Sequence, residues 1–128
     1  MGKLLRVMAG QEVIADKVIM ADTYQLRKQG LLGRSSLAQN EGALLSMPYQ
    51  SRLSFFFSIH MFGMQFSLAA AWIDQGGNIL ETKFAQPGRI YFPSGLFTDT
   101  QYILELHPGH LPILRNTNRL TWEVVNGS

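Results

Sequence analysis

Residues 53–73 read Leu53-Ser-Phe-Phe-Phe-Ser-Ile-His-Met-Phe-Gly-Met-Gln-Phe-Ser-Leu-Ala-Ala-Ala-Trp-Ile73 and form the longest apolar run of the chain. The run contains no Asp, Glu, Lys or Arg, and its length matches the roughly 20 residues of a membrane-spanning helix. Its serine, glutamine and histidine side chains would each need a partner inside lipid, however. On both sides of Gly63 the side chains alternate with period two, which is typical of strands. The run therefore predicts two buried strands bent at Gly63, around which the remaining elements pack.

The flanking sequence supplies further short elements, each bounded by turn or cap residues. Asp22-Thr23 and Gly30 have the chemistry of an N-cap and a C-cap for a helix over residues 24–29. Gly76-Gly77 predicts a tight hairpin. A second short helix is predicted over residues 111–115, where Pro112 is tolerated in the first turn. The predicted strands cover residues 4–8, 12–20, 43–47, 79–84, 100–106 and 119–125, and a segment kept irregular by Pro93 and Gly95 covers residues 90–97.

These elements predict a mainly β (α+β) fold. The expected architecture is a small antiparallel β-barrel or curled sheet with two short helices, forming a single domain over residues 1–128. The chain has 128 residues, which is within the length of one domain.

Composition excludes several classes of function. Charged residues make up only 16% of the chain, against about a quarter in typical domains, and the net charge is +2. The basic residues are dispersed, so we expect no nucleic-acid binding. The chain has no cysteine, and its N-terminal apolar segment is too short for a signal peptide. A cytoplasmic location is expected, with no membrane-spanning segment, although peripheral membrane association stays open.

Four segments carry a family resemblance, and together they cover most of the chain from Glu12 to Glu123. They are Ala21-Asp-Thr with Gly30-Leu-Leu-Gly-Arg-Ser-Ser-Leu37 and Glu41-Gly42; Ser58-Ile-His-Met-Phe-Gly-Met64 with Trp72-Ile-Asp74; Pro87 with Arg89; and Tyr102-Ile-Leu-Glu-Leu106 with Gly109. In order and spacing they resemble the bacterial and archaeal family called domain of unknown function 192. The resemblance implies a compact β-rich domain and assigns no activity.

The chain departs from the family pattern at charged positions. Where the family has Arg and Asp after the Gly-Met pair, this chain has Gln65 and Ala69, and Thr117-Asn118 replaces a Gly-Asp near the C-terminus. Any family role that needs those charges is in doubt for this chain. By this measure the chain resembles a divergent member of the family.

The candidate catalytic chemistry is sparse. His107 and His110 flank a Pro-Gly turn, so helical ligand spacing does not apply to them, and no acidic residue directly flanks any of the three histidines. We therefore expect no metal site and no cofactor. No serine lies in a Gly-x-Ser-x-Gly elbow, and the nine acidic residues are scattered singly. We therefore expect no catalytic residues and no enzymatic activity.

Segments 55–72 and 91–97 contain more aromatic side chains than one pair of strands can bury on one face of a small sheet. These side chains either fill the core or form a docking surface. The leading hypothesis is a non-catalytic binding or structural subunit that docks onto a larger protein assembly. The alternative is a protein with a pocket for a small ligand, a peptide or a sugar. The candidate ligand-binding or partner-binding residues are His60, Gln65, Arg34, Tyr91, Phe92 and Phe97.

Overall fold

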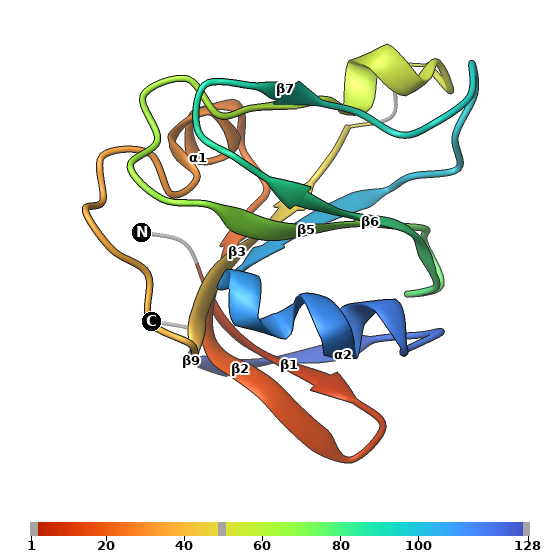
Figure 1. The fold of residues 1–128 in the computed structure, drawn as a ribbon. Helices are drawn as coiled ribbons and strands as arrows, with labels where there is room; N and C mark the ends of the chain where they lie inside the picture. Colours follow the sequence, from red (N-terminus) through yellow and green to blue (C-terminus); the bar gives the residue numbers. More distant parts are fainter. Residues whose placement is uncertain (1–2, 49–50, 127–128) are drawn as a thin grey trace.

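The computed structural model describes residues 3–48 and 51–126. Its main feature is a seven-stranded sheet with the strand order β6-β5-β8-β3-β2-β1-β9 (Figure 1). The strands of this sheet are β1 (Leu4–Ala9), β2 (Glu12–Ala21), β3 (Glu41–Ser46), β5 (Leu68–Ile73), β6 (Ile79–Ala85), β8 (Tyr102–Leu106) and β9 (Thr121–Asn126). A separate ribbon pairs β4 (Ile59–His60) with β7 (Ile90–Tyr91). The helices are α1 (Tyr24–Gln29) and α2 (Leu111–Arg115), and the 3-10 segments are η1 (Ser54–Phe57) and η2 (Pro108–His110).

The fold is mainly β, as predicted, but the sheet is mixed and is not closed into a barrel. β2 and β3 are parallel, because the connection through α1 returns the chain to the starting end of the sheet. β6 and β9 form the two edges, and one isolated bridge between Asn78 and Arg119 joins the segments that precede them. The barrel prediction is therefore wrong, and the curled sheet is the architecture observed.

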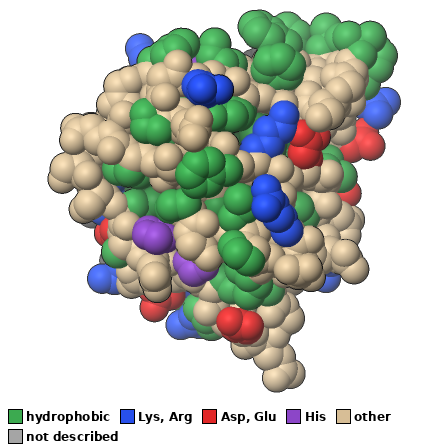
Figure 2. Space-filling model, viewed as in Figure 1, with side chains coloured by type: hydrophobic (Ala, Val, Ile, Leu, Met, Phe, Trp, Pro, Cys, Tyr) green, Lys and Arg blue, Asp and Glu red, His purple; other side chains and the backbone are tan. Residues whose placement is uncertain are grey.

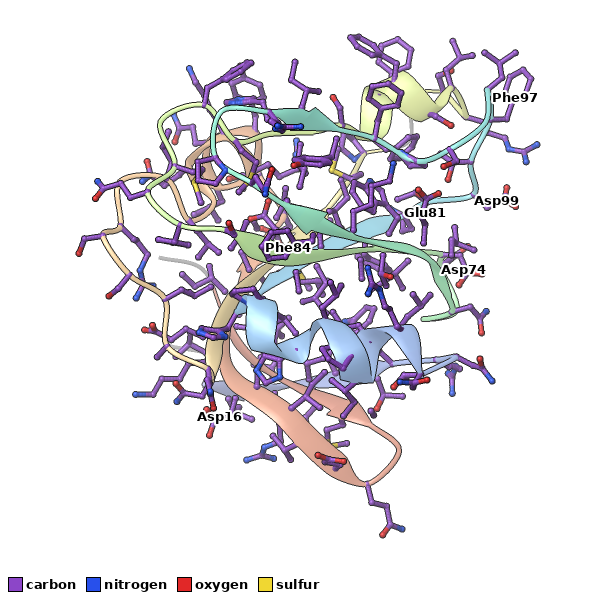
Figure 3. All side chains as sticks on the ribbon, in the orientation of Figure 1. Asp16, Asp74, Glu81, Phe84, Phe97 and Asp99 are labelled. Atoms are coloured by element: carbon purple, nitrogen blue, oxygen red, sulfur yellow. The ribbon has the colours of Figure 1, made fainter. Side chains whose placement is uncertain are left out.

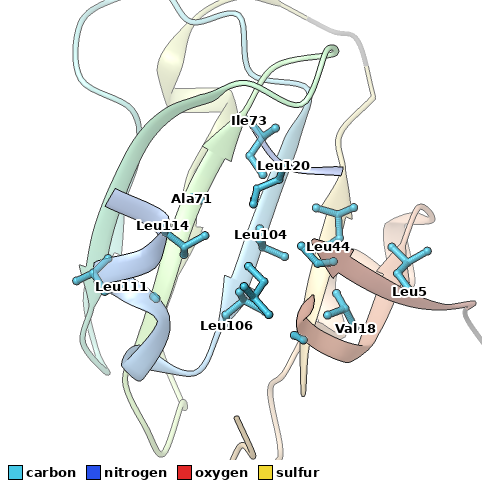
Figure 4. Close-up of a cluster of buried hydrophobic side chains, with 14 residues drawn as sticks. Leu5, Val18, Leu44, Ala71, Ile73, Leu104, Leu106, Leu111, Leu114 and Leu120 are labelled. Atoms are coloured by element: carbon cyan, nitrogen blue, oxygen red, sulfur yellow. The ribbon is translucent and has the colours of Figure 1, made fainter. Parts of the chain in front are cut away.

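β5 is buried along its whole length and divides the core into two clusters. Ala69, Ala71 and Ile73 pack on the face that also buries Leu111 and Leu114 of α2 (Figure 4). The alternate residues of β5 pack on the opposite face, against Leu31, Phe57 and Met61. Figure 1 shows the corresponding layers, with α1 and the β4–β7 ribbon above β5 and β6, and α2 below these two strands, between them and β1, β2 and β9. Burial on both faces explains why β5 is uniformly apolar.

The prediction of a strand before Gly63 is wrong for most of the residues that it covers. Residues 54–57 form η1, in which the buried side chains are Ser54 and Phe57, three positions apart. A spacing of three matches a 3-10 turn and not a strand. The indole nitrogen of Trp72 donates to the Phe57 carbonyl over 2.7 Å, which fixes η1 to β5. The bend at Gly63 is confirmed by its φ of 79° and by a 3.2 Å hydrogen bond from Met64 N to Met61 O.

Elements specified by local chemistry are confirmed. The Thr23 hydroxyl accepts from Leu26 N over 3.1 Å at the start of α1, and Gly30 ends the helix with a φ of 46°. The β1–β2 and β5–β6 hairpins and α2 also occur where they were expected.

Within the described residues, no helix is long and apolar enough to cross a membrane.

A substitution at Gly42 tests how closely β3 packs against β8. A Cβ atom at Gly42 would overlap the backbone carbonyl of Glu105 and would lie 2.6 Å from Leu106 Cδ2. We expect Gly42→Ala to lower the free energy of unfolding by about 1–3 kcal/mol. Ser46→Ala on the same strand is the control and should change it by less than about 0.5 kcal/mol. Urea unfolding measures both, and equal stabilities of the two variants would contradict the close approach.

Candidate functional site

A pocket of about 390 Å³ lies between α1, the end of β3 and the segment that contains β4. Its walls are mainly apolar and come from three parts of the chain. Leu31 and Leu32 follow α1, Leu45 and Met47 come from β3 and its end, and Ile59, Met61 and Met64 lie around β4 and the Gly63 turn. Methionine side chains adapt to ligands of different shape, which suits a binding pocket. The volume is near the lower end of the range of about 300–1,000 Å³ found for small-molecule sites.

Glu105 lines this pocket and is the buried acidic residue of the described chain. It lies in β8 between Leu104 and Leu106, and only 7% of its surface is exposed. Its neighbour Ile103 belongs to the cluster beneath α1, so the alternation of β8 turns Glu105 toward the same side. Its Oε1 atom would lie 3.5 Å from a Cβ atom placed on Gly30, the residue that ends α1. The chain therefore carries a carboxyl group into the interior, directly beneath the end of a helix.

The Glu105 carboxyl group has no protein partner within the part of the chain that the structure describes. None of the hydrogen bonds or ion pairs found there involves its side-chain oxygens. Removal from water disfavours the ionised carboxylate, and burial raises the pKa of Glu105 to about 7. Among the described residues the fully enclosed side-chain polar atom without a partner is Ser54 Oγ, so the Glu105 oxygens are reached from the pocket.

Three basic side chains that line the pocket are exposed or half-exposed to solvent and define its mouth. Arg27 and Lys28 come from the last turn of α1, and His60 comes from β4. The Arg27 guanidinium donates to the Ser46 carbonyl over 3.1 Å, so this donor is directed at backbone and not at Glu105. His60 is exposed and stacks on Phe62 with their ring centroids 5.5 Å apart. The arrangement places positive charge at the entrance and one carboxyl group inside.

Among the predicted site residues, His60 lines the pocket, while Gln65 and Arg34 lie outside it. Gln65 is exposed beyond the Gly63 turn. Arg34 forms a 2.8 Å ion pair with Glu41. A hydrogen bond from the Ala38 backbone, together with Arg34, lowers the pKa of Glu41. This pair holds the loop between α1 and β3 in place, which is a structural role.

Phe92 and Phe97 belong to an apolar surface composed of exposed side chains from η1 and the β7–β8 connection: Phe55, Phe56, Phe92, Leu96 and Phe97. Phe55 and Phe92 are in edge-to-face contact, with ring centroids 6.2 Å apart. Hydrophobic side chains gather over these segments at the top right of Figure 2, and Figure 3 places Phe97 there. Tyr91 is half-buried beside this surface, and its hydroxyl accepts from Gln86 N over 2.9 Å. The tyrosine therefore braces a turn.

The apolar surface is firmly attached to the sheet. Ser54 N donates to Leu96 O over 2.9 Å, and Thr98 N donates to Arg52 O over 2.7 Å, so η1 and the β7–β8 connection are cross-linked. On β6, Glu81 accepts from Ser94 N over 2.9 Å, and Lys83 donates to Phe92 O over 2.8 Å. The aromatic residues are thus divided between the core and the surface. Phe57 and Trp72 are in the core, while the five side chains of the apolar surface are exposed.

The histidines form local contacts. His107 accepts from Gly109 N over 3.0 Å through Nδ1, and His110 contacts the Gln39 carbonyl through Nε2. Among the described residues, no group of three or more His, Cys, Asp or Glu side chains could hold a metal ion. The basic mouth and the buried carboxyl group are therefore the main chemical features of the pocket.

Sequence periodicity gives only a weak signal for Glu105. Residues 100–106 alternate as an ordinary half-exposed strand does, and Glu105 shares its face with Ile103. The informative signal lies in the neighbouring strand β5, whose apolar residues occupy both faces. Once β8 is placed beside β5, a charged residue on either face of β8 must be buried.

The fold defines a class of small domains with a mixed, curled sheet covered on both faces. Two solved structures share it. A protein of unknown function from Novosphingobium aromaticivorans has a TM-score of 0.71 and 17% identity, with 94% of this chain and 83% of that chain covered. A Sinorhizobium meliloti protein described as a candidate transcription regulator has a TM-score of 0.73 and 21% identity, with 97% and 94% covered. At these identities the likeness establishes the fold alone.

Sequence comparison identifies the family. The model of the DUF192 family, described as Uncharacterized ACR, matches residues 6–115. A UPF0127 protein of Thermococcus sibiricus is 30% identical over 115 residues, covering 88% of this chain and 70% of that protein. A UPF0127 protein of Thermococcus gammatolerans is 29% identical over 110 residues, covering 84% and 67%. The chain belongs to the DUF192 family, which confirms the resemblance seen in the sequence.

The raised pKa of Glu105 predicts a specific dependence of stability on pH. Between the ordinary value of 4.5 and about 7, the folded protein holds a proton that the unfolded chain releases. The free energy of unfolding should therefore fall as the pH rises through this window, by about 3 kcal/mol in total, and should stay lowered above it. Glu105→Gln cannot ionise, so this fall should be absent in the variant.

Urea unfolding at pH 5 and pH 8 measures the effect. The difference between wild type and Glu105→Gln isolates residue 105, because every other titratable group is common to both proteins. Glu123→Gln, at an exposed position on β9, is the control and should keep the wild-type dependence. An identical pH dependence in wild type and Glu105→Gln would show that the carboxyl group is not buried as described.

Proposed function

We propose that the protein binds a small, largely apolar molecule in the pocket beneath α1. The observation that carries this proposal is the Glu105 carboxyl group, which is buried, lines the pocket and has no partner within the described residues. A carboxyl group in an apolar wall that makes no hydrogen bond with the protein is available to a ligand that supplies a donor. A few convergent polar groups in an otherwise apolar pocket are the usual composition of a ligand site.

Binding accounts for this pocket better than catalysis does. A pKa near 7 would also suit a general acid or base. Such a group needs a reacting partner, however, and no nucleophile is hydrogen-bonded to Glu105 within the described part of the chain. Ser58 and His60 line the same pocket without a hydrogen bond between their side chains. The proposed activity is therefore non-catalytic, with His60 at the entrance.

A blocked pocket tests this proposal. Met64→Trp should fill the space between the Gly63 turn and α1, and Met8→Trp on β1 is the matched control outside the pocket. We expect at least one member of a library of apolar metabolites to raise the melting temperature of wild type and of the Met8→Trp variant by several degrees. The same compound should leave the melting temperature of Met64→Trp unchanged.

Ligand-observed NMR on the same three proteins provides an independent readout of binding. Absence of any ligand at millimolar concentration would refute the proposed function. A ligand that binds Met64→Trp as well as wild type would place the site elsewhere.

A second candidate function is favoured by the apolar surface. We propose that this surface docks onto a protein assembly, as the low charge and the surplus of aromatic residues first suggested. Phe55, Leu96 and Phe97 are each at least 60% exposed, and the nearby Arg52 and Asp99 neutralise each other in a 2.7 Å ion pair. A neutral apolar surface is inexpensive to desolvate and suits an apolar patch on a partner.

Exposed aromatic side chains can be removed from this surface with little effect on the fold. We expect the double variant Phe55→Ser/Phe97→Ser to elute as a free monomer from size-exclusion chromatography of native cell extract, with light scattering to give the mass, while wild type elutes in a larger complex. Phe84→Ser on β6, with 43% of Phe84 exposed, is the control and should behave as wild type does. A monomeric wild type would contradict docking.

A further inference from the structure

The ligand that completes the pocket beneath α1 must satisfy three features at once, which are the buried carboxyl group, the apolar walls and the basic mouth. This inference rests on the proposed small-ligand function. Each feature restricts the chemistry of a different part of the ligand.

The carboxyl group requires a hydrogen-bond donor. Glu105 is 7% exposed, and two of the side-chain donors that line the pocket, those of Arg27 and Gln29, are directed elsewhere. Arg27 uses one guanidinium nitrogen for the Ser46 carbonyl, and Gln29 donates to the Leu32 carbonyl over 2.7 Å. An ammonium group carries three donors and a positive charge, so it both completes the hydrogen bonds of the carboxylate and neutralises it.

The mouth requires the opposite charge at the other end of the ligand. Arg27 and Lys28 lie on the last turn of α1, and Glu105 is the acidic residue among those that line the pocket. A ligand with positive charge alone would be repelled at the entrance, whereas a zwitterion with its carboxylate toward α1 would be attracted. A phosphate ester lacks the cation that Glu105 requires, and a sugar would leave the apolar walls in contact with hydroxyl groups.

The walls require an apolar body between the two charges. Leu31, Leu45 and Met61 are buried side chains that line the pocket, and Met64 is half-buried beside them. The volume of about 390 Å³ accommodates one or two amino-acid residues. We propose that the pocket binds the α-ammonium group of an apolar amino acid, free or at the N-terminus of a short peptide, with Glu105 as its counter-ion.

Calorimetric titration with matched probes tests this inference. The probes are L-leucine, the dipeptide Leu-Gly and N-acetyl-Leu-Gly, each titrated into wild type, Glu105→Gln and the surface control Glu123→Gln. We expect leucine or Leu-Gly to bind wild type and Glu123→Gln. Tighter binding of leucine would identify the ligand as a free amino acid, and tighter binding of Leu-Gly would identify it as a peptide N-terminus. Acetylation of Leu-Gly should weaken binding at least tenfold, because it removes the ammonium charge, and Glu105→Gln should weaken the binding of the amines equally.

Proton release provides a second readout that a merely structural role of Glu105 would not produce. Among residues 3–48 and 51–126, the titratable and charged groups that face the pocket are Tyr24, Arg27 and Lys28 from α1, His60 from β4 and Glu105 from β8, and the lining residues from β3 are apolar. An ammonium ligand draws Glu105 into its ionised form, so binding near neutral pH should release a proton. The binding enthalpy should then vary with the ionisation enthalpy of the buffer in wild type and be constant in Glu105→Gln.

Each outcome separates this inference from the proposed function. Equal binding of Leu-Gly and its acetylated form, unchanged affinity in Glu105→Gln, or no binding of either amine at millimolar concentration would overturn the assignment of an ammonium ligand. If neutral apolar metabolites still bind wild type and fail to bind Met64→Trp, the pocket function stands and only the ligand class falls. Near-UV circular dichroism of Glu105→Gln checks that the variant keeps its packed core.

Discussion

The structure depends on the burial of β5 on both of its faces. All six residues of this strand are buried, and consecutive side chains contribute to different clusters. A strand of this kind is stable only if separate elements cover each face, because either face left open would expose a row of apolar side chains to water. α2 covers one face, and α1, η1 and the β4–β7 ribbon cover the other (Figure 1). The short helices thus form because the sheet needs covering, since helices of five and six residues are unstable alone.

The same constraint explains how a carboxylic acid becomes buried. β8 pairs with β5 on one side and with β3 on the other, so it lies inside the covered part of the sheet. Any residue of β8 that faces α1 is removed from water, whatever its chemistry, and Glu105 is such a residue. No hydrogen bond or ion pair with the described residues compensates for the burial of this carboxyl group. Proteins commonly retain a destabilising group where function requires it, and the position of Glu105 in the pocket wall is consistent with that trade-off.

The sequence predicts those elements whose signals are local. The caps of α1 at Thr23 and Gly30 and the turn at Gly63 depend on a few neighbouring atoms, and each occurs where its residues predict it. Elements whose conformation depends on contacts between residues distant in sequence are predicted poorly. η1 forms where alternation predicted a strand, because Phe57 reaches the core beside Trp72 while Phe55 and Phe56 face outward. The parallel pairing of β2 with β3 likewise depends on the path through α1, which no residue pattern specifies.

The candidate site follows the same division. Of the residues selected by type, His60 lies at the pocket and Phe92 and Phe97 lie on the apolar surface, because exposed aromatic and imidazole groups are recognisable individually. Arg34 and Gln65 were selected with them, but one braces a loop through Glu41 and the other is exposed outside the pocket. Glu105 is not recognisable individually, because an acidic residue in an alternating strand is normally exposed. Its importance comes from the elements above it, which are remote in sequence.

The pocket and the apolar surface lie at different ends of the layer that covers one face of the sheet. α1 is at the left of this layer and η1 at the right in Figure 1, with β4 and β7 between them. Both regions rest on one cluster, since Phe57 of η1 and Met61 and Leu31 of the pocket wall are buried together. The proposed ligand pocket and the proposed docking surface therefore use different residues. They do depend on the same buried contacts, so the attachment of η1 to Trp72 contributes to the shape of both sites.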